Sequence, residues 1–258
     1  MKMGFRLAVF LIFSIASVLM FYLPYLEIKE QTTAKLNEKQ MLLAKQTAFG
    51  IENFFKEQRN LLLHFATNPN FIDLTDMGKM AITREIENHH DVIRAITVYG
   101  TDGVIKYSYP NPEAVIGKDI SGQSHVKKIL TEHRINVSDV FMAVQGYQAV
   151  ALSEPIFKGE EFVGVIAFLI DFQHIAKTYL ESIQIGESGY AWVISRDGTE
   201  LYCPVPGHTG VNISETSAKF PALLQMAEEM KAGKSGTTTY MYDMVRDSKT
   251  EPITKYAV

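Results

Sequence analysis

An uninterrupted apolar segment near the N-terminus constrains this chain more than any other feature. Residues 7–26 read LAVFLIFSIASVLMFYLPYL and contain no charged side chain. A helix of 20 residues at about 1.5 Å per residue is about 30 Å long, which matches the hydrocarbon core of a bilayer. We therefore predict a transmembrane helix over residues 7–26.

The flanking residues predict how this helix is oriented. Lys2 and Arg6 lie in the short segment before it, residues 1–6, and basic residues favour the cytoplasmic side. The alternative is a cleaved signal peptide, but the run is longer than such an apolar region and ends without a small-x-small cleavage site. The sequence thus predicts a single-pass anchor in the inner or plasma membrane, with the bulk of the chain extracytoplasmic.

Residues 27–66 predict a long helix that leads directly out of the membrane. The segment contains no proline and one glycine, Gly50. Apolar residues recur at helical spacing, and charged and amide residues fill the positions between them. Asn68-Pro69-Asn70 predicts the end of this helix, and we assign residues 27–75 to a stalk. A helix of this length commonly packs against a second copy, so the sequence also favours a homodimer.

The rest of the chain contains one pattern twice. Residues 95–107 and 191–202 align when Asp102-Gly103 is matched with Asp197-Gly198, and each copy predicts a β-hairpin. A helix over residues 83–90 precedes the first copy. Similar segments follow each copy in the same order: GKDIS, a helix at 125–133 and strands at 137–144, 148–157 and 162–171; then GVNIS, a helix at 221–231 and strands at 236–244 and 251–258.

This order predicts an α+β fold with two tandem modules that have antiparallel sheets, at residues 76–183 and 184–258. We call them the first and the second module. The second has no counterpart of the strand at 162–171, and a sheet without that strand would have an unpaired edge. We therefore expect the second module to be incomplete and the sequence to be truncated.

Charge and cysteine content exclude several classes of protein. The formal net charge of −4 does not favour a nucleic-acid binder that neutralises phosphates. Cys203 is the only cysteine, so an intramolecular disulfide and a multi-cysteine metal site are impossible. His89-His90-Asp91 is not a metal-ligand pattern, because adjacent side chains on a helix point apart. We expect no metal and no cofactor, and we interpret Cys203 as structural.

The order of anchor, long helix and two modules resembles the double Cache sensor domains of prokaryotic chemoreceptors, sensor histidine kinases and diguanylate cyclases. The phrases that carry the resemblance are Gly103-Val-Ile-Lys-Tyr-Ser, Gly117-Lys-Asp-Ile-Ser, Ser153-Glu-Pro-Ile-Phe, Phe162-Val-Gly-Val-Ile and Gly186-Glu-Ser-Gly-Tyr-Ala-Trp-Val-Ile-Ser-Arg-Asp-Gly. The resemblance implies PAS-like modules. It also implies that the first module is distal from the membrane and holds a small-molecule pocket.

The resemblance further implies the ligand-sensing region of a membrane signal-transduction receptor. Such a region is not an enzyme, and a kinase or cyclase output domain would lie beyond the end of this chain. No Gly-x-Ser-x-Gly or His-Glu-x-x-His motif is present in the sequence. The alternative is a membrane-anchored ligand-binding protein without an output domain of its own.

The resemblance also implies candidate ligand contacts. The family's pocket lies between the sheet and the segment after the first hairpin, here residues 117–130. Amino-acid-binding members have a tyrosine, an arginine, a tryptophan, a second tyrosine and an aspartate at the positions of Lys118, Gln123, His125, Phe141 and Asp171, so only the aspartate is retained. The full candidate set is Asp171, His125, Gln123, Phe141, Tyr107, Tyr147 and Lys118.

The loss of the arginine leaves the ligand class open. Gln123 has no charge with which to pair a ligand carboxylate. Lys118, Lys127 or protonated His125 would hold a carboxylate, and Asp171 with aromatic faces would hold an amine. The sequence therefore predicts a small polar ligand that is a carboxylate, an amine or amino-acid-like. Asp171 has an alternative role, because an aspartate after an apolar strand also caps a following helix.

Overall fold

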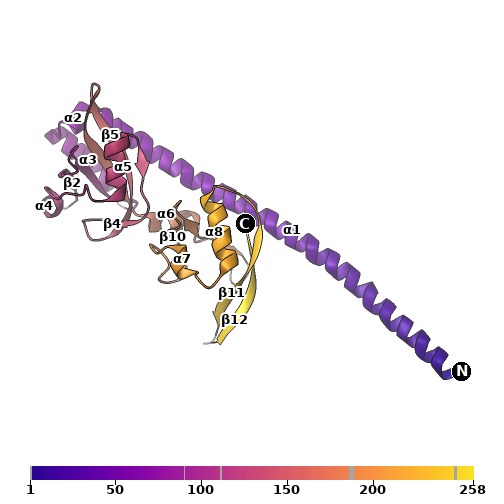
Figure 1. Ribbon diagram of the computed structural model, residues 1–258. Helices are drawn as coiled ribbons and strands as arrows, with labels where there is room; N and C mark the ends of the chain where they lie inside the picture. The colour runs from indigo at the N-terminus through magenta and orange to yellow at the C-terminus, as the bar shows by residue number, and fades with distance from the viewer. Residues whose placement is uncertain (1, 90, 111, 186–188, 247–248) are drawn as a thin grey trace.

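The computed structural model describes residues 2–89, 91–110, 112–185, 189–246 and 249–258. Its longest element is helix α1 (Lys2–Thr67), which continues through Pro24. The predicted anchor and stalk are therefore one continuous helix, which ends directly before Asn68-Pro69-Asn70. Figure 1 shows the N-terminal half of α1 extending away from the rest of the chain.

The N-terminal part of α1 is apolar and uncovered. Its large hydrophobic side chains from Phe10 to Ile28 are exposed. Its most apolar 18-residue window is long enough to cross a membrane, and none of that window is buried against other parts of the chain. Exposed apolar area of this extent is unfavourable in water, so this part of α1 has the properties of a membrane-spanning helix rather than of a core helix.

The first module is built on an antiparallel sheet with strand order β2-β1-β6-β5-β3, and β4 pairs with β5 beside this path. Five short helices connect and cover it. The strands are β1 (Ile93–Tyr99), β2 (Ile105–Tyr109), β3 (Asn136–Val137), β4 (Phe141–Met142), β5 (Gln148–Lys158) and β6 (Glu161–Ile170). The helices are α2 (Pro69–Ile72), α3 (Asp76–His89), α4 (Pro112–Val115), α5 (Ser124–Glu132) and α6 (Phe172–Tyr179).

Two predicted elements differ from the structure. The helix predicted at residues 83–90 begins earlier, as α3, because the Thr75 hydroxyl accepts a hydrogen bond from the Gly78 N–H and caps it. The continuous strand predicted at 137–144 is wrong, since only β3 and β4 form there. The Ser138 N–H still donates to the Ala151 carbonyl at 2.9 Å, but the Ala151 N–H donates to the Ser138 hydroxyl at 2.7 Å instead of to a backbone carbonyl, which ends the regular ladder here.

One face of the first sheet packs against α1 and α3. Ile96, Val98 and Phe168 belong to a buried cluster that also contains Leu62 and Phe65 of α1. The Phe65 and Phe168 rings meet edge to face with their centroids 6.0 Å apart. This packing fixes the C-terminal end of α1 to the sheet.

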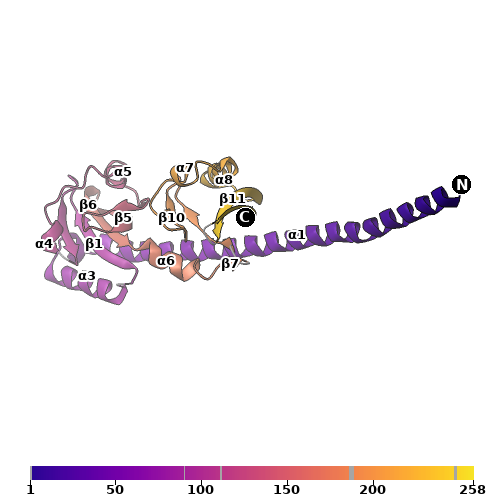
Figure 2. The same ribbon diagram turned by 90° about the horizontal axis from the view of Figure 1, so that it is seen from below.

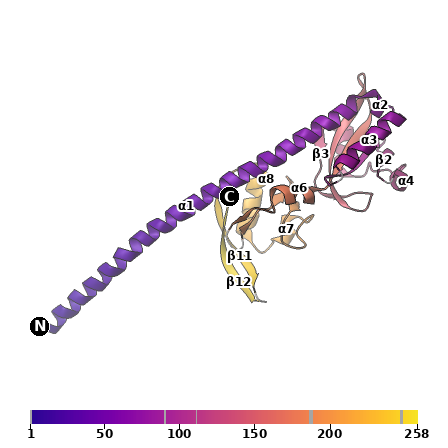
Figure 3. The same cartoon turned by 180° about the vertical axis from the view of Figure 1, so that it is seen from behind.

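The second module consists of three two-stranded antiparallel sheets within the described residues. Their strands are β7 (Gln184–Ile185) with β8 (Gly189–Tyr190), β9 (Val193–Ile194) with β10 (Glu200–Tyr202), and β11 (Thr238–Arg246) with β12 (Lys249–Ala257). Helices α7 (Ile213–Thr216) and α8 (Pro221–Lys231) lie between β10 and β11 in the chain. Figures 2 and 3 show that both modules lie side by side along the C-terminal half of α1.

The internal repeat predicted from the sequence is confirmed in the backbone. Val104 forms an isolated bridge with Asp119 in the first module, and Thr199 forms the same bridge with Asn212 in the second. The N–H of Ile120 donates to the carbonyl of Gly103, and Ile213 donates equivalently to Gly198. The hairpin and the phrase that follows it therefore have the same fold in both modules.

Candidate functional site

A small cavity lies on the other face of the first sheet, between the sheet and the segment that contains α5 and β4. Its volume is about 20 Å³, which is room for a single water molecule. Three of the candidate residues line it: Gln123, His125 and Phe141. The full lining is Thr97, Tyr99, Ile105, Ile120, Gln123, His125, Phe141, Val144, Gln145, Ala151, Ser153, Ala167 and Leu169.

Side-chain size along the strands explains why a cavity forms on this face. Residues alternate between the two faces of a strand. The face towards α1 carries bulky residues such as Ile96, Leu152 and Phe168. The face towards α5 carries the small residues Ala151 and Ala167 at the positions between them. The small side chains leave space that the α5 segment does not fill.

Two hydroxyl groups in the cavity lining are buried next to each other. The oxygens of Tyr99 and Ser153 are fully enclosed and interact with each other, but their contact falls short of a hydrogen bond of normal geometry. Nearby, Gln145 Nε2 donates to Thr97 Oγ1 at 3.4 Å, so this part of the lining is already paired. An unsatisfied buried hydroxyl costs about 1–3 kcal/mol, which a hydrogen bond from a bound molecule would remove.

His125 lies at the start of α5 and packs against Phe141, with ring centroids 4.2 Å apart. Burial lowers the pKa of the His125 imidazole to about 4, because the charged form would lose its hydration. The ring is therefore neutral at pH 7. A charge on His125 is therefore not expected to hold a carboxylate at neutral pH, and contact between His125 and a ligand stays a prediction.

A charged group lies beside the cavity. Arg94 Nη1 is 3.6 Å from Asp171 Oδ2, and the Arg94 guanidinium lies 5.0 Å from the centroid of the Tyr147 ring. Burial raises the pKa of the Tyr147 phenol to about 12, and its hydroxyl oxygen is buried without a partner among the described residues. Tyr147 packs on a cluster that includes Ala151, which also lines the cavity.

Asp171 also has the structural role left open by the sequence. Its Oδ1 accepts hydrogen bonds from the N–H groups of Gln173 at 3.0 Å and His174 at 3.3 Å, so it is the N-cap of α6. The other carboxylate oxygen of Asp171, Oδ2, forms the ion pair with Arg94. One carboxylate thus both caps a helix and forms an ion pair next to the cavity.

Two candidates lie elsewhere. Tyr107 pairs with Val98 across β1 and β2, and cross-strand partners share a face of the sheet, so it packs on the α1 side. Tyr107 therefore lies on the opposite face of the sheet from the cavity, and its contact with a ligand stays a prediction. Lys118 is exposed beside the turn at Gly117 (φ 83°) and is not among the described lining residues, and Lys127 is exposed as well.

Sequence reasoning missed Arg94, Thr97, Tyr99, Gln145 and Ser153. Small residues such as Ala151 and Ala167 alternate with larger apolar residues along β5 and β6. This alternation is visible in the sequence, and it marks the face of the sheet on which the cavity forms. Arg94 carries no comparable signal, because it lies at an irregularity in the register between β1 and β6, between Ile93 and Ala95.

The chain matches known proteins in fold and in sequence profile. The profile of the Cache domain family matches residues 25–251. A search of curated proteins found no match. The ligand-binding domain of the Pseudomonas fluorescens chemoreceptor CtaA, solved with L-serine, is similar at a TM-score of 0.63 and 16% identity, covering 87% of this chain and 89% of that one.

Two further solved structures have the same fold. A domain of a putative sensory box/GGDEF family protein from Vibrio parahaemolyticus aligns at a TM-score of 0.59 and 11% identity, covering 87% of this chain and 96% of that one. An extracellular ligand binding receptor from Desulfohalobium retbaense aligns at a TM-score of 0.56 and 16% identity. That alignment covers 84% of this chain, which spans 39% of the receptor.

The family profile covers most of the chain, including the end of the anchor, the stalk and both modules. The solved structures share its fold, and the double Cache resemblance seen in the sequence is confirmed. This chain belongs to the Cache domain family, whose members serve as ligand-binding sensor domains of chemoreceptors and other signalling proteins.

Proposed function

We propose that this chain is the extracytoplasmic ligand-sensing region of a membrane signal-transduction receptor, and that a small polar metabolite binds in the first module. The observation that carries this proposal is the cavity lined by the buried hydroxyl groups of Tyr99 and Ser153, whose contact with each other falls short of a full hydrogen bond. In this arrangement, α1 spans the membrane, and the first module is the distal one. Two copies of the chain pair through the stalk.

A cavity of about 20 Å³ is too small for a metabolite, so binding requires an opening. Phe141 of β4 covers the cavity together with Val144 and Gln145, which lie in the connection between β4 and β5. That connection contains a tight turn in which the Gly146 N–H donates to the Ala143 carbonyl. Displacement of this turn would join the cavity to the space beside Tyr147, Arg94 and Asp171.

The charges beside the cavity favour a zwitterionic ligand. Arg94 is suited to a bidentate contact with a carboxylate, and Asp171 Oδ2 to an amine. Arg94 and Asp171 lie 3.6 Å apart in an ion pair. A ligand with a carboxylate and an amine would break this pair and give each side chain a new partner of opposite charge. An amino acid or an amino-acid-like compound fits this pair better than a simple amine or carboxylate. The fold neighbour CtaA was solved with L-serine, which agrees with this class.

The site has a short connection to the stalk. Asp171 caps α6, and Tyr179 at the end of α6 packs against Gly50 of α1. A ligand that draws Asp171 away from the α6 N-terminus would move α6 against α1. The ligand shifts this equilibrium only to the extent that its affinity differs between the two arrangements.

The test is a thermal-shift screen of the full chain in detergent against amino acids, amines, and mono- and dicarboxylates. A ligand at 100 times its Kd stabilises the folded state by about 2.7 kcal/mol. Arg94→Ala should abolish the shift given by a carboxylate-bearing hit, whereas Arg134→Ala, a change at an exposed arginine on the same module, should leave it intact.

Tyr99→Phe and Ser153→Ala separate ligand binding from folding. Each change removes one buried hydroxyl of a weakly interacting pair, so the ligand-free protein should stay within about 1 kcal/mol of the parent in its free energy of unfolding. If the ligand bonds to these hydroxyls, its affinity should fall about 3- to 10-fold. Unchanged affinity in both variants and in Arg94→Ala would refute the first-module site.

A further inference from the structure

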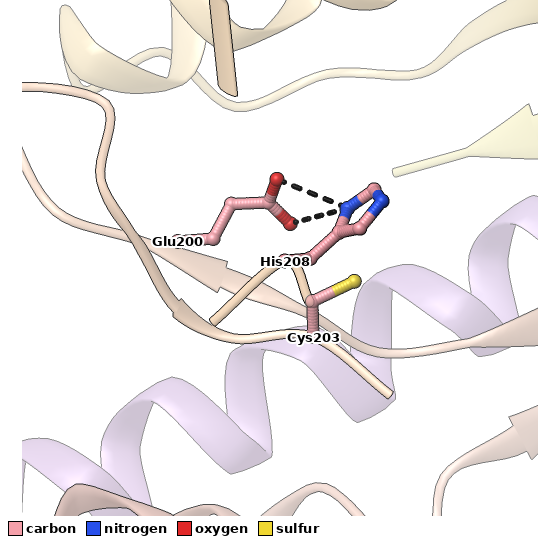
Figure 4. A group of neighbouring side chains, drawn as sticks. All are labelled: Glu200, Cys203 and His208. Carbon is pink, nitrogen blue, oxygen red and sulfur yellow. Dashed lines mark hydrogen bonds and ion pairs between the residues drawn. The ribbon is translucent and has the colours of Figure 1, made fainter. Parts of the chain in front are cut away.

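Three metal-ligating side chains meet in the second module, away from the cavity. Glu200 lies on β10, Cys203 follows that strand, and His208 lies in the loop that leads to α7. One ligand atom from each, the carboxylate oxygen, the sulfur and a ring nitrogen, lies within 4.8 Å of the other two. Figure 4 shows the carboxylate and the imidazole facing each other, with the Cys203 side chain beside them.

The geometry of this cluster is close to that of a zinc site. His208 Nδ1 lies 3.2 Å from Glu200 Oε1 and 3.3 Å from Oε2. Two ligands at about 2.1 Å from a tetrahedral Zn²⁺ lie about 3.4 Å apart. A sulfur at about 2.3 Å from the ion would lie about 3.6 Å from the other two ligands. A rotation of the Cys203 side chain that moves the sulfur by about 1 Å would complete this geometry.

The loop holds the three residues in place without a metal. The Glu200 N–H donates to the Val211 carbonyl, and the Gly210 N–H donates back to the Glu200 carbonyl. The Cys203 N–H donates to the Thr209 hydroxyl at 3.3 Å. Thr216 donates a hydrogen bond to Glu200 Oε1. Such a partner fixes the orientation of a ligating carboxylate.

The first module shows that this fold does not require polar residues here. By the shared hydrogen-bond pattern, Glu200 corresponds to Ile105 and His208 to Val115. Ile105 and Val115 are 2% and 1% exposed and belong to one apolar cluster. The second module thus replaces a buried aliphatic pair with a carboxylate, whose side chain is 3% exposed, and an imidazole. A buried ionic pair is often no more stable than an apolar pair of the same volume, so stability alone does not account for the exchange.

We propose that Glu200, Cys203 and His208 bind one Zn²⁺ ion. The set contains an oxygen, a sulfur and a nitrogen ligand, which suits the borderline-soft Zn²⁺ better than Mg²⁺ or Ca²⁺. A carboxylate and a thiolate neutralise the two charges of the ion, and the thiol proton passes to solvent when the sulfur binds. Three protein ligands leave the fourth position for water or an outside ligand. The expectation from sequence that the chain holds no metal rested on the single cysteine and on the His89-His90-Asp91 run. Neither reveals which side chains this loop brings together.

The test is direct Zn²⁺ titration of the full chain in detergent after it has been stripped with a chelator, with a competing indicator dye. We expect one ion per chain. Cys203→Ser and His208→Ala should each weaken binding at least 10-fold, and His64→Ala, a change at an exposed histidine on α1, should leave it unchanged. Co²⁺ in place of Zn²⁺ should give the near-ultraviolet charge-transfer band of a thiolate ligand, and Cys203→Ser should remove it.

Two results would overturn the proposal. One is Zn²⁺ affinity that is the same in the parent and in the Cys203→Ser/His208→Ala double variant. The other is a Co²⁺ spectrum of the parent without a thiolate band. Circular dichroism of each variant checks that it is folded. Glu200→Gln keeps the size of the side chain, so its weaker binding in a folded protein would indicate loss of a ligand rather than loss of structure.

Discussion

The first module has its strands in one sheet that is covered on both faces, whereas the second has separate two-stranded sheets within the described residues. Among the described residues, the buried members of the second module's own cluster are Ile213, Leu223 and Ala227. A groove of about 660 Å³ separates much of this module from α1, between β9, the end of β12 and Gln40–Glu52 of the helix. The same hairpin and loop therefore occur in two packing environments, one closed and one open. Because the two modules share this backbone pattern, a difference between them in the free energy of unfolding reflects side-chain packing rather than topology.

Core truncation should give the largest difference. Phe168→Ala removes a ring that is 0% exposed and packed between β6 and Phe65 of α1. We expect a loss of about 3–5 kcal/mol in the free energy of unfolding. Leu223→Ala in the smaller cluster should cost about 2 kcal/mol, because fewer neighbours surround the space left. Urea titration measures both values, and equal losses would contradict the distinction between closed and open packing.

The second largest effect concerns pH and the first module. The pKa of His125 is lowered from 6.5 to about 4, so the unfolded state binds more protons than the folded state between these values. Stability is therefore full above about pH 6.5 and is lost as the pH falls towards 4, by on the order of 3 kcal/mol. His125→Gln should remove this dependence. Denaturant titrations at pH 7 and pH 4.5 measure it, and a parent-like pH slope in His125→Gln would contradict the assignment.

Helix caps allow a matched comparison of smaller effects. Asp171 caps α6 in the first module, and Asn212 caps α7 in the second by accepting from the Ser214 N–H at 3.0 Å. Asp171→Ala and Asn212→Ala should each cost about 1 kcal/mol. Asp171→Asn should keep the cap while losing the charge. It should therefore retain most of the stability and lose affinity for an amine-bearing ligand. If the folded Asp171→Asn variant binds the amine-bearing ligand with unchanged affinity, then Asp171 caps α6 and does not contact the ligand.

The smallest net effect is expected where the first module meets the stalk. A Cβ at Gly50 would lie 2.8 Å from Tyr179 Cε1 and 2.9 Å from Cδ1. Alanine raises helix stability by about 1 kcal/mol relative to glycine, and the displaced ring offsets that gain. Gly50→Ala should therefore be within about 1 kcal/mol of the parent. In a double-mutant cycle with Tyr179→Leu, the stabilising effect of Gly50→Ala should appear once the ring is gone. Strict additivity would contradict a close contact between α1 and α6.

Local signals in the sequence predicted most of the fold. Residues 221–231 were predicted as a helix and form α8, since Pro221 is suited to the first turn and the apolar spacing is regular. The paired Asp-Gly turns predicted the hairpins because Gly103 and Gly198 both adopt positive φ. The strand predicted at residues 137–144 failed because the side chain of Ser138 takes the place of a backbone acceptor.

The site was predictable only in part. Gln123, His125 and Phe141, which line the cavity, were indicated by the resemblance to the family rather than by residue spacing. The sequence did not show that Tyr107 lies on the α1 face, since that depends on its pairing with Val98 next to a register shift. Arg94 and the cluster of Glu200, Cys203 and His208 depend on bulges and loop closure, which residue spacing does not encode.

The continuity of α1 has a mechanical consequence. No break separates the part packed against the first sheet from the part that is apolar and exposed, so the helix acts as a stiff lever. The helix from Leu26, in the apolar exposed part, to Leu62, which packs against the sheet, measures about 54 Å at about 1.5 Å per residue. A tilt of about 1° at the sheet therefore displaces the other end by about 1 Å, a distance comparable to helix shifts at subunit interfaces. A sensor with this geometry needs only a very small rearrangement around its ligand.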